Sequence, residues 1–316
     1  MKRRDFLAAG AAAAAALAFP ARAAYPDKAV HYIIPFAPGG ESDIAARFQQ
    51  TVYRKKYSQE LVIDSKPGAG GALAWSQLNG FAGDGYTVMG VNLPHIILQP
   101  MESTASYKTD DITSVSYFNY TPDAIVVRMD SPFKAYAEFI AAAKAKSGSL
   151  NIAGSGTNSA NHVAHERLTR AAGIKTTYVP FKGTGDLIAS VLGGHVDAAM
   201  SYNSLAVAQK GKVRLLAVAT PQRLPSFPDV PTFREVGIDW VDGAYRGICV
   251  PKSTPEELRV RISDMFAEIN RDTEFRRQMT EQGLELQDIT YEKMPAFMEE
   301  RRKAYTEVAK LMGLAS

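Results

Sequence analysis

The sequence predicts an α/β protein of two domains, each with a mostly parallel sheet flanked by helices. Short runs of β-branched residues alternate along the chain with segments that keep their apolar residues at helical spacing, and glycine-rich turns join them. In addition, the 316 residues exceed what one hydrophobic core usually serves.

The first domain is predicted to open with a strand over residues 30–34, where β-branched side chains dominate. The next segment, residues 42–57, places Ile44, Phe48 and Val52 on one face of a helix. Up to residue 122 we further expect a strand over 61–64, a helix from the glycine turn at 66–71 to about residue 82, and a strand over 86–91.

The same order restarts near residue 123, where we place the start of a second domain that ends at residue 235. Ser131-Pro132 suits the N-cap and the first position of a helix. We expect strands over residues 124–127, 150–153, 177–179 and 196–200, and helices over residues 131–146, 159–172 and 186–192.

The C-terminal part is predicted to return to the first domain. Capping-box patterns stand at Thr232 with Glu235 and at Thr254 with Glu257. A short strand over residues 245–250 precedes a long amphipathic helix, and a helix over residues 292–312 closes the chain. We therefore expect the first domain to combine residues 24–122 and 236–316. Two crossing connections would then leave a cleft and a hinge between the domains.

The first 23 residues predict an export signal. Lys2-Arg3-Arg4 precedes an apolar run over residues 7–19, and Ala21-Arg22-Ala23 offers small residues for cleavage near Ala23. The apolar run is too short to cross a bilayer core of ~30 Å. Adjacent arginines followed by Phe6-Leu7 are typical of a twin-arginine signal, although Sec signals also begin with Lys-Arg. We therefore expect the mature protein in the periplasm.

Charge and cysteine content exclude several classes of protein. Removal of residues 1–23 takes away four basic residues and one acidic residue, so the formal net charge falls from +3 to zero. A neutral chain lacks the basic surface that nucleic acid or an anionic membrane requires. Cys249 is the sole cysteine, so no internal disulfide can form. The histidines show neither cysteine pairing nor HExxH spacing, and we expect no metal and no cofactor.

Two glycine-rich loops are the best candidates for a binding site. They are residues 36–43 and residues 154–159, each between a predicted strand and a predicted helix. Free backbone N–H groups and the positive end of a helix favour an anion at such loops. Neither loop matches a nucleotide-phosphate motif, and Ser155 lacks the G-x-S-x-G elbow because residue 153 is alanine. A carboxylate is therefore the predicted anion, and ordinary turns with helix caps are the alternative.

Short blocks follow one another in a characteristic order across the mature chain. They are Pro35-Phe36-Ala37-Pro38-Gly39-Gly40 with Asp43 and Ala46-Arg47, Lys66-Pro67-Gly68-Ala69-Gly70-Gly71, Asp84-Gly85-Tyr86-Thr87, Gly154-Ser155-Gly156-Thr157, Val179-Pro180-Phe181-Lys182-Gly183, Gly193-Gly194-His195-Val196-Asp197, Leu216-Ala217-Val218-Ala219 and Pro228-Asp229-Val230-Pro231-Thr232. Together these blocks resemble the solute-binding receptors of tripartite tricarboxylate transporters, also called the Bug family.

This resemblance implies a periplasmic binding protein of type II, whose two domains close on an organic acid as a Venus flytrap and deliver it to a two-component membrane permease. It also implies that amides and bridging waters of the first loop hold one carboxylate. Carried over by motif, the ligand-binding residues are Ala37, Gly39, Gly40 and Asp43 in the first loop, Ser155, Thr157 and Ser159 in the second, and Lys182, Gly183, Thr184 and Asp186 in the lysine-glycine block.

The chain departs from the family pattern at two places. Met200-Ser201-Tyr202 stands where relatives commonly have Phe-Asp-Asn, which removes a carboxylate near the cleft and disfavours an amino-acid ligand. Tyr202 itself remains a candidate ligand contact. Arg246 stands in a block where relatives often have tryptophan, and it could pair with a second carboxylate of the ligand. A solvated surface arginine is the alternative.

Other candidate contacts carry alternatives of their own. Asn92 and His95 follow the third predicted strand at its C-terminal end, where α/β clefts open, or else they cap their own turn. Asp43 either stabilises the helix N-terminus or accepts a ligand amine. Lys182 either steers anions or closes a turn.

We therefore predict a receptor for a carboxylate-bearing small molecule that makes and breaks no bond. Mono-, di- and tricarboxylates and aromatic acids all remain open as ligands. A sensory ligand-binding protein that feeds a signalling partner has the same binding chemistry and is one alternative. An exported hydrolase or isomerase with His95 or His162 as base is another, although no triad order is recognisable. We expect a monomer, since the domains must move.

Overall fold

The structure is a computed structural model that describes residues 25–102 and 105–314. The predicted export signal, residues 1–23, lies outside the described residues. None of the described helices combines the length and the apolar character that a membrane crossing requires.

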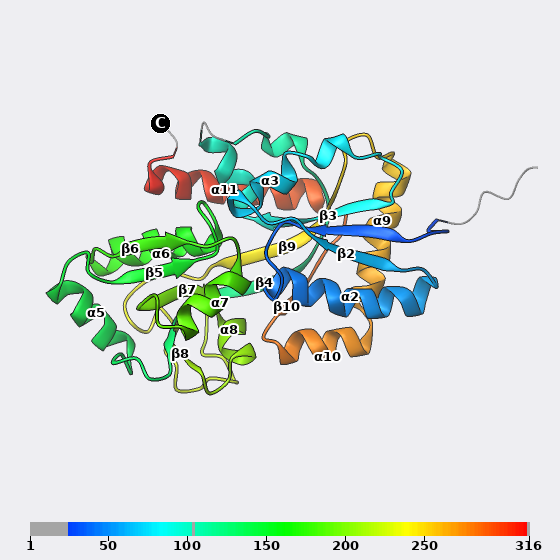
Figure 1. The fold of residues 1–316 in the computed structure, drawn as a ribbon. Coiled ribbons are helices and arrows are strands. Elements are labelled where there is room, and N and C mark those ends of the chain that lie inside the picture. Colours follow the sequence, from blue (N-terminus) through cyan, green and yellow to red (C-terminus); the bar gives the residue numbers. More distant parts are fainter. Residues whose placement is uncertain (1–24, 103–104, 315–316) are drawn as a thin grey trace, which may run out of the picture.

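The chain folds into mixed sheets with helices on their faces (Figure 1), which confirms the predicted α/β class. The first part contains β1 (Val30–Ile34), α2 (Glu41–Tyr57), β2 (Leu61–Ser65), η1 (Ala69–Gly71), α3 (Ala72–Trp75), η2 (Leu78–Gly80), β3 (Thr87–Leu93), α4 (His95–Leu98), η3 (Gln99–Met101) and η4 (Thr109–Asp111). The helix predicted to continue to residue 82 is broken into these short pieces. Ser76 explains part of the break, because its hydroxyl donates to the Leu73 carbonyl at 2.9 Å where α3 ends.

The middle part contains β4 (Thr113–Arg128), α5 (Tyr136–Ala145), β5 (Asn151–Gly154), α6 (Ala160–Ala172), β6 (Thr177–Pro180), α7 (Thr184–Leu192), β7 (Ala198–Tyr202), α8 (Asn203–Ala208) and β8 (Val213–Val218). The predicted strand over residues 124–127 is only the end of the long strand β4. The helix predicted from residue 131 begins instead at Tyr136, because the Ser131 hydroxyl accepts the Phe133 N–H in a local turn.

The last part contains β9 (Gly243–Val250), α9 (Glu256–Asn270), α10 (Thr273–Glu281), β10 (Glu285–Ile289) and α11 (Met294–Met312). The capping box predicted at Thr232 and Glu235 forms through both reciprocal bonds. The one predicted at Thr254 is wrong: Pro255 takes the N-cap position of α9 without a side-chain bond.

Strand order explains why the sheets are mixed where mostly parallel ones were predicted. The order is β2-β1-β3-β9-β4-β7-β5-β6, and β8 and β10 also pair with β4. Strands β1, β2 and β3 are parallel, as are β5, β6 and β7. However, β4 and β9 pair antiparallel with each other, and β4 also pairs antiparallel with β7. These two strands carry the chain between the halves (Figure 1), so neither half is purely parallel.

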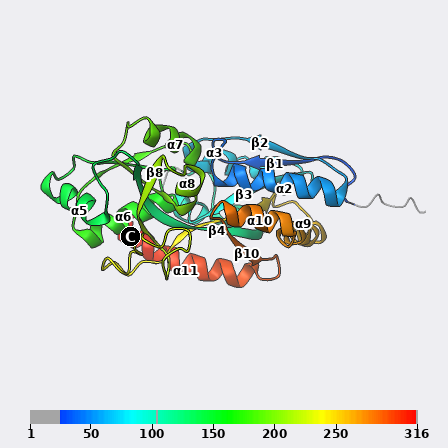
Figure 2. The same cartoon turned by 90° about the horizontal axis from the view of Figure 1, so that it is seen from below.

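Each half has its own buried apolar side chains. One cluster joins the N-terminal strands to the C-terminal helices and includes Ile34, Trp75, Phe266 and Tyr305. The other half packs α5 and α6 on one face of its sheet and α7 and α8 on the opposite face. Helix α11 reaches from the first half to α6 of the second (Figure 2). The loops at the facing ends of the parallel strands are thereby brought together.

Candidate functional site

The two predicted loops meet between the halves. The first links β1 to α2, and the second links β5 to α6. A cavity of about 20 Å³ lies between them, enough for about one water molecule, and we call it the inner cavity. Its lining residues are Phe36, Ala37, Gly40, Glu41, Ser42, Asp43, Asn92, His95, Ser155, Thr184, Tyr202 and Arg246.

The inner cavity thus brings together most of the residues predicted to bind ligand. They are Ala37, Gly40, Asp43, Asn92, His95, Ser155, Thr184, Tyr202 and Arg246. Thr157, Lys182 and Asp186 instead line a separate open groove of about 740 Å³, the outer groove, together with residues such as Gly70 and Gln99. Gly39, Ser159 and Gly183 line neither space.

The N-terminus of α2 supplies hydrogen-bond donors to the inner cavity. Gly40 is its N-cap and offers no side chain to cap the first turn, so the first N–H groups remain available for an anion. Asp43 is already engaged: its carboxylate accepts the Gly39 N–H at 3.0 Å and pairs with Arg47 at 3.0 Å. Asp43 therefore holds the loop in shape.

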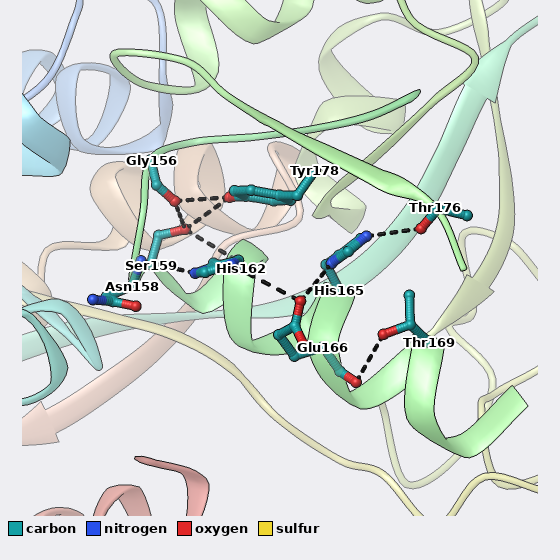
Figure 3. Close-up of polar contacts among 9 residues, drawn as sticks. All are labelled: Gly156, Asn158, Ser159, His162, His165, Glu166, Thr169, Thr176 and Tyr178. Carbon is teal, nitrogen blue, oxygen red and sulfur yellow. Dashed lines mark hydrogen bonds and ion pairs between the residues drawn. The ribbon is translucent and has the colours of Figure 1, made fainter. Parts of the chain in front are cut away.

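The second loop is held by side chains behind it (Figure 3). Ser159 accepts the His162 N–H at 3.1 Å and donates to the Gly156 carbonyl at 2.7 Å, so it acts as the N-cap of α6. The Tyr178 hydroxyl donates to the same carbonyl at 2.7 Å. The Asn158 N–H donates to His162 Nδ1 at 3.1 Å. Ser159 and His162 thus shape the loop from outside the inner cavity.

His95 contributes a neutral imidazole to the inner cavity. Its ring meets the rings of Phe36 and Trp75 edge-on at centroid distances of 5.5 and 6.0 Å. Burial, with a further contribution from the positive charge of Arg246, lowers the pKa of His95 to about 3. The imidazole is therefore uncharged near pH 7 and can offer a hydrogen bond but no charge to a ligand.

Arg246 is buried, which makes the surface interpretation of this residue wrong. The residue is only 3 % exposed, and strand pairing places it between Asn92 of β3 and Asn119 of β4. Nη1 donates to Asn119 Oδ1 at 3.2 Å and to the Thr121 hydroxyl. The guanidinium carbon lies 4.8 Å from the ring centroid of Tyr202, a cation–π contact.

Glu41 is a site residue that the sequence did not predict. It begins α2 directly after Gly40, is 5 % exposed, and places Oε2 3.6 Å from Arg246 Nη2. Its Oε1 accepts the Ser204 hydroxyl at 2.8 Å. An acidic residue next to the glycine pair was visible in the sequence, but both of its partners lie far away along the chain. Phe36 and Ser42 were also missed.

The halves touch through glycines. A Cβ on Gly185 would lie 2.0 Å from the Pro38 carbonyl oxygen, and a Cβ on Gly156 would lie 2.9 Å from Gly70 Cα. Gln99 Nε2 also reaches the Thr157 carbonyl at 3.4 Å. These contacts hold the two halves against each other, and the contacts of Gly156 and Gln99 lie at the outer groove.

Known proteins resemble this chain over most of its length. A sequence profile described as the tripartite tricarboxylate transporter family receptor matches residues 45–314. A Cupriavidus necator protein, "UPF0065 protein in gbd 5'region", is 30 % identical and covers 100 % of this chain and 99 % of its own length. Protein BugT of Bordetella pertussis is 29 % identical over 79 % of each chain.

Solved structures agree with the profile. The periplasmic binding protein BugD has a TM-score of 0.85 at 26 % identity and covers 92 % of this chain and 99 % of its own. MatC from Rhodopseudomonas palustris, solved with bound malate, has a TM-score of 0.82 at 27 % identity over 90 % and 99 %. An R. palustris protein solved with adipate has a TM-score of 0.86 at 25 % identity over 92 % and 99 %.

Proposed function

This chain belongs to the receptor family of the tripartite tricarboxylate transporters, a family of periplasmic solute-binding proteins, and we propose that it captures a small carboxylate-bearing organic acid for a membrane permease of that type. The inner cavity is the feature that bears most directly on this function. The uncapped N-terminus of α2, the buried Arg246 and the neutral His95 converge there from different elements.

The convergence of donors on a buried cavity is the observation that carries this proposal. Backbone N–H groups at a helix N-terminus suit one carboxylate, and the side chains around them restrict the rest of the ligand. Relatives support the same ligand class, since one was solved with malate and another with adipate. The inner cavity has room for about one water molecule, so an organic acid fits there only after the halves have moved apart.

Binding requires the halves to separate and close again. We propose that residues 24–122 with 236–316 and residues 123–235 act as the two domains, joined by the crossing strands. A ligand would enter while they are apart, and its differential contact with the closed form would drive closure. Export by a twin-arginine signal, cleavage near Ala23, and action as a monomer are parts of the same proposal.

Thermal unfolding of residues 24–316 with a panel of acids tests the proposal. The panel contains aliphatic and aromatic mono-, di- and tricarboxylates, with amino acids and neutral sugars for comparison. A ligand at ~100 times its Kd should stabilise the protein by ~2.7 kcal/mol, which raises the melting temperature by several degrees.

A rise with one class of acid supports the receptor proposal. The panel is repeated after refolding from denaturant, so that a co-purified ligand cannot mask binding. If no acid raises the melting temperature of the refolded protein, the proposed function is wrong.

A further inference from the structure

Glu41 adds a negative charge to the inner cavity beside its one buried arginine. The carboxylate lines the cavity, and its two oxygens face Arg246 and Ser204. Glu41 comes from α2 of the first half, and Ser204 comes from α8 of the second. Glu41 is therefore held in place from both sides of the cleft and is buried in this arrangement.

Arg246 is already neutralised in this arrangement. Asn119 and Thr121 occupy Nη1, Glu41 lies near Nη2, and the Tyr202 ring covers one face. Nε has no hydrogen-bond partner among the described residues, and Nη2 meets Glu41 in an ion pair at 3.6 Å without a hydrogen bond. The guanidinium can therefore still donate hydrogen bonds to a ligand, but it shares its charge with Glu41, so a second carboxylate finds no free cation there.

The other charges around the inner cavity also cancel. Asp43 pairs with Arg47, and His95 is neutral near pH 7. Glu41 and Asp43 both lie in the first turn of α2, where the helix end carries roughly half a positive charge, and the first N–H groups of the helix remain as donors for one carboxylate. These charges favour a ligand with one carboxylate and disfavour a ligand with two.

We propose that Glu41 makes this receptor select acids with a single carboxylate, whose other end carries a neutral or cationic group. The inference rests on the proposed function and narrows its ligand class. A second carboxylate near Arg246 would meet the like charge of Glu41 in a desolvated site, which is unfavourable. A hydroxyl or ammonium at the same place could donate to Glu41.

Glu41 also bears on ligands that carry an amine. Ser201 stands where relatives commonly have aspartate, and the loss of that carboxylate disfavoured an amino-acid ligand. Glu41 supplies a carboxylate to the inner cavity from another element. A cationic group on the ligand can therefore pair with the Glu41 carboxylate.

Matched acids of one chain length test this selectivity. Calorimetry measures the Kd of succinate, butyrate, γ-hydroxybutyrate and γ-aminobutyrate with the refolded wild-type protein; hexanoate and adipate repeat the comparison for a longer ligand. We expect succinate to bind at least tenfold more weakly than the best of its three monocarboxylate counterparts, in line with the cost of placing like charges together. Equal or tighter binding of succinate would overturn the proposal.

The Glu41→Gln variant tests the residue itself. The amide keeps a bond to Ser204 but frees the charge of Arg246, so succinate should gain at least tenfold in affinity. Butyrate should change by less than about threefold, because its single carboxylate interacts with α2. Glu60→Gln removes the same charge from an exposed position and should alter neither ligand. Unchanged selectivity in Glu41→Gln would contradict the role of Glu41.

A second variant covers the case in which an unpaired Arg246 prevents folding. Glu41→Gln combined with Arg246→Met removes both buried charges, so the affinity of succinate relative to butyrate should not rise above the wild-type ratio, whatever butyrate itself loses. A gain of succinate relative to butyrate in this double variant would also count against the proposal. If acids bind the wild type but succinate matches butyrate, only the selectivity is wrong. If no acid binds the refolded wild type, the proposed function itself fails.

Discussion

At the scale of single residues, burial decides which polar side chains around the inner cavity carry charge. His95 is fully buried against aromatic rings, and its pKa falls to about 3 from an ordinary value of 6.5. The folded state therefore binds fewer protons than the unfolded state between these values. The stability that the neutral ring contributes is present above pH 6.5 and is lost as the pH falls toward 3.

His95→Gln should accordingly reduce the acid sensitivity of the fold. Each unit of pKa shift corresponds to ~1.4 kcal/mol, so the variant should lose several kcal/mol less than the wild type between pH 6.5 and the folded pKa. Urea unfolding across this range measures the difference. Burial also lowers the pKa of His162 and His165 and raises that of Asp123, so only the difference between variant and wild type is informative.

His195→Gln is the matched control for this experiment, because His195 is exposed. The control should follow the wild type at every pH. If the free energy of unfolding of His95→Gln falls in parallel with that of the wild type as the pH is lowered, the interpretation of His95 as a buried neutral imidazole is wrong.

Single residues also show what the sequence alone could and could not predict about the site. Family motifs and loop positions were enough to predict most of the lining of the inner cavity. They could not predict that Arg246 is buried, because that follows from strand pairing with Asn92 and with Asn119, far away along the chain. The role of Glu41 was invisible for the same reason. A buried charge is recognised by its partners, and those come from other elements.

At the scale of elements, local signals predicted the strand–loop–helix units that carry the site. The β-branched run of β1, the glycine turn after it and the apolar stripe of α2 are all local. Elements that depend on distant pairing were missed or shortened. Strand β4 was predicted only at its end, and β10, which pairs with it, was not predicted.

A substitution at Gly185 tests how closely α7 and the first loop must approach each other for binding. Gly185 lies in the first turn of α7, where an added Cβ would come within 2.0 Å of the Pro38 carbonyl oxygen in the first loop. We expect Gly185→Ala to weaken acid binding at least tenfold by holding the halves apart. The free energy of unfolding should fall by less than ~1 kcal/mol, because alanine suits a helix better than glycine. Calorimetry and urea unfolding measure the two effects.

Gly80→Ala is the control for Gly185→Ala, since no atom lies within 4 Å of its added Cβ. It should leave affinity unchanged. If Gly185→Ala binds as tightly as this control, contact between α7 and the first loop is not needed for binding.

At the scale of the whole molecule, closure of the two halves depends on the strands that cross between them. Residues 113–122 of β4 pair with β9 in the first sheet, while residues 123–128 pair with β7 and β8 in the second. A change of backbone angle near residue 122 would therefore move one sheet relative to the other. The glycine contacts between loops would part together with it.

Spin labels across the outer groove should report this motion. Ala72 of α3 and Ala189 of α7 line the groove from opposite halves, and the native Cys249 is buried, so labels on Ala72→Cys and Ala189→Cys would be specific. Without ligand we expect a broad distance distribution with a long component. An acid that raises the melting temperature should shift the distribution to one short, narrow component, because only the closed form makes all the ligand contacts.

Labels on Lys144→Cys and Lys175→Cys are the control. Both residues are exposed in the second half, so the distance between these labels should not shift. An inter-half distribution that stays the same at saturating ligand would mean that the receptor binds without closing.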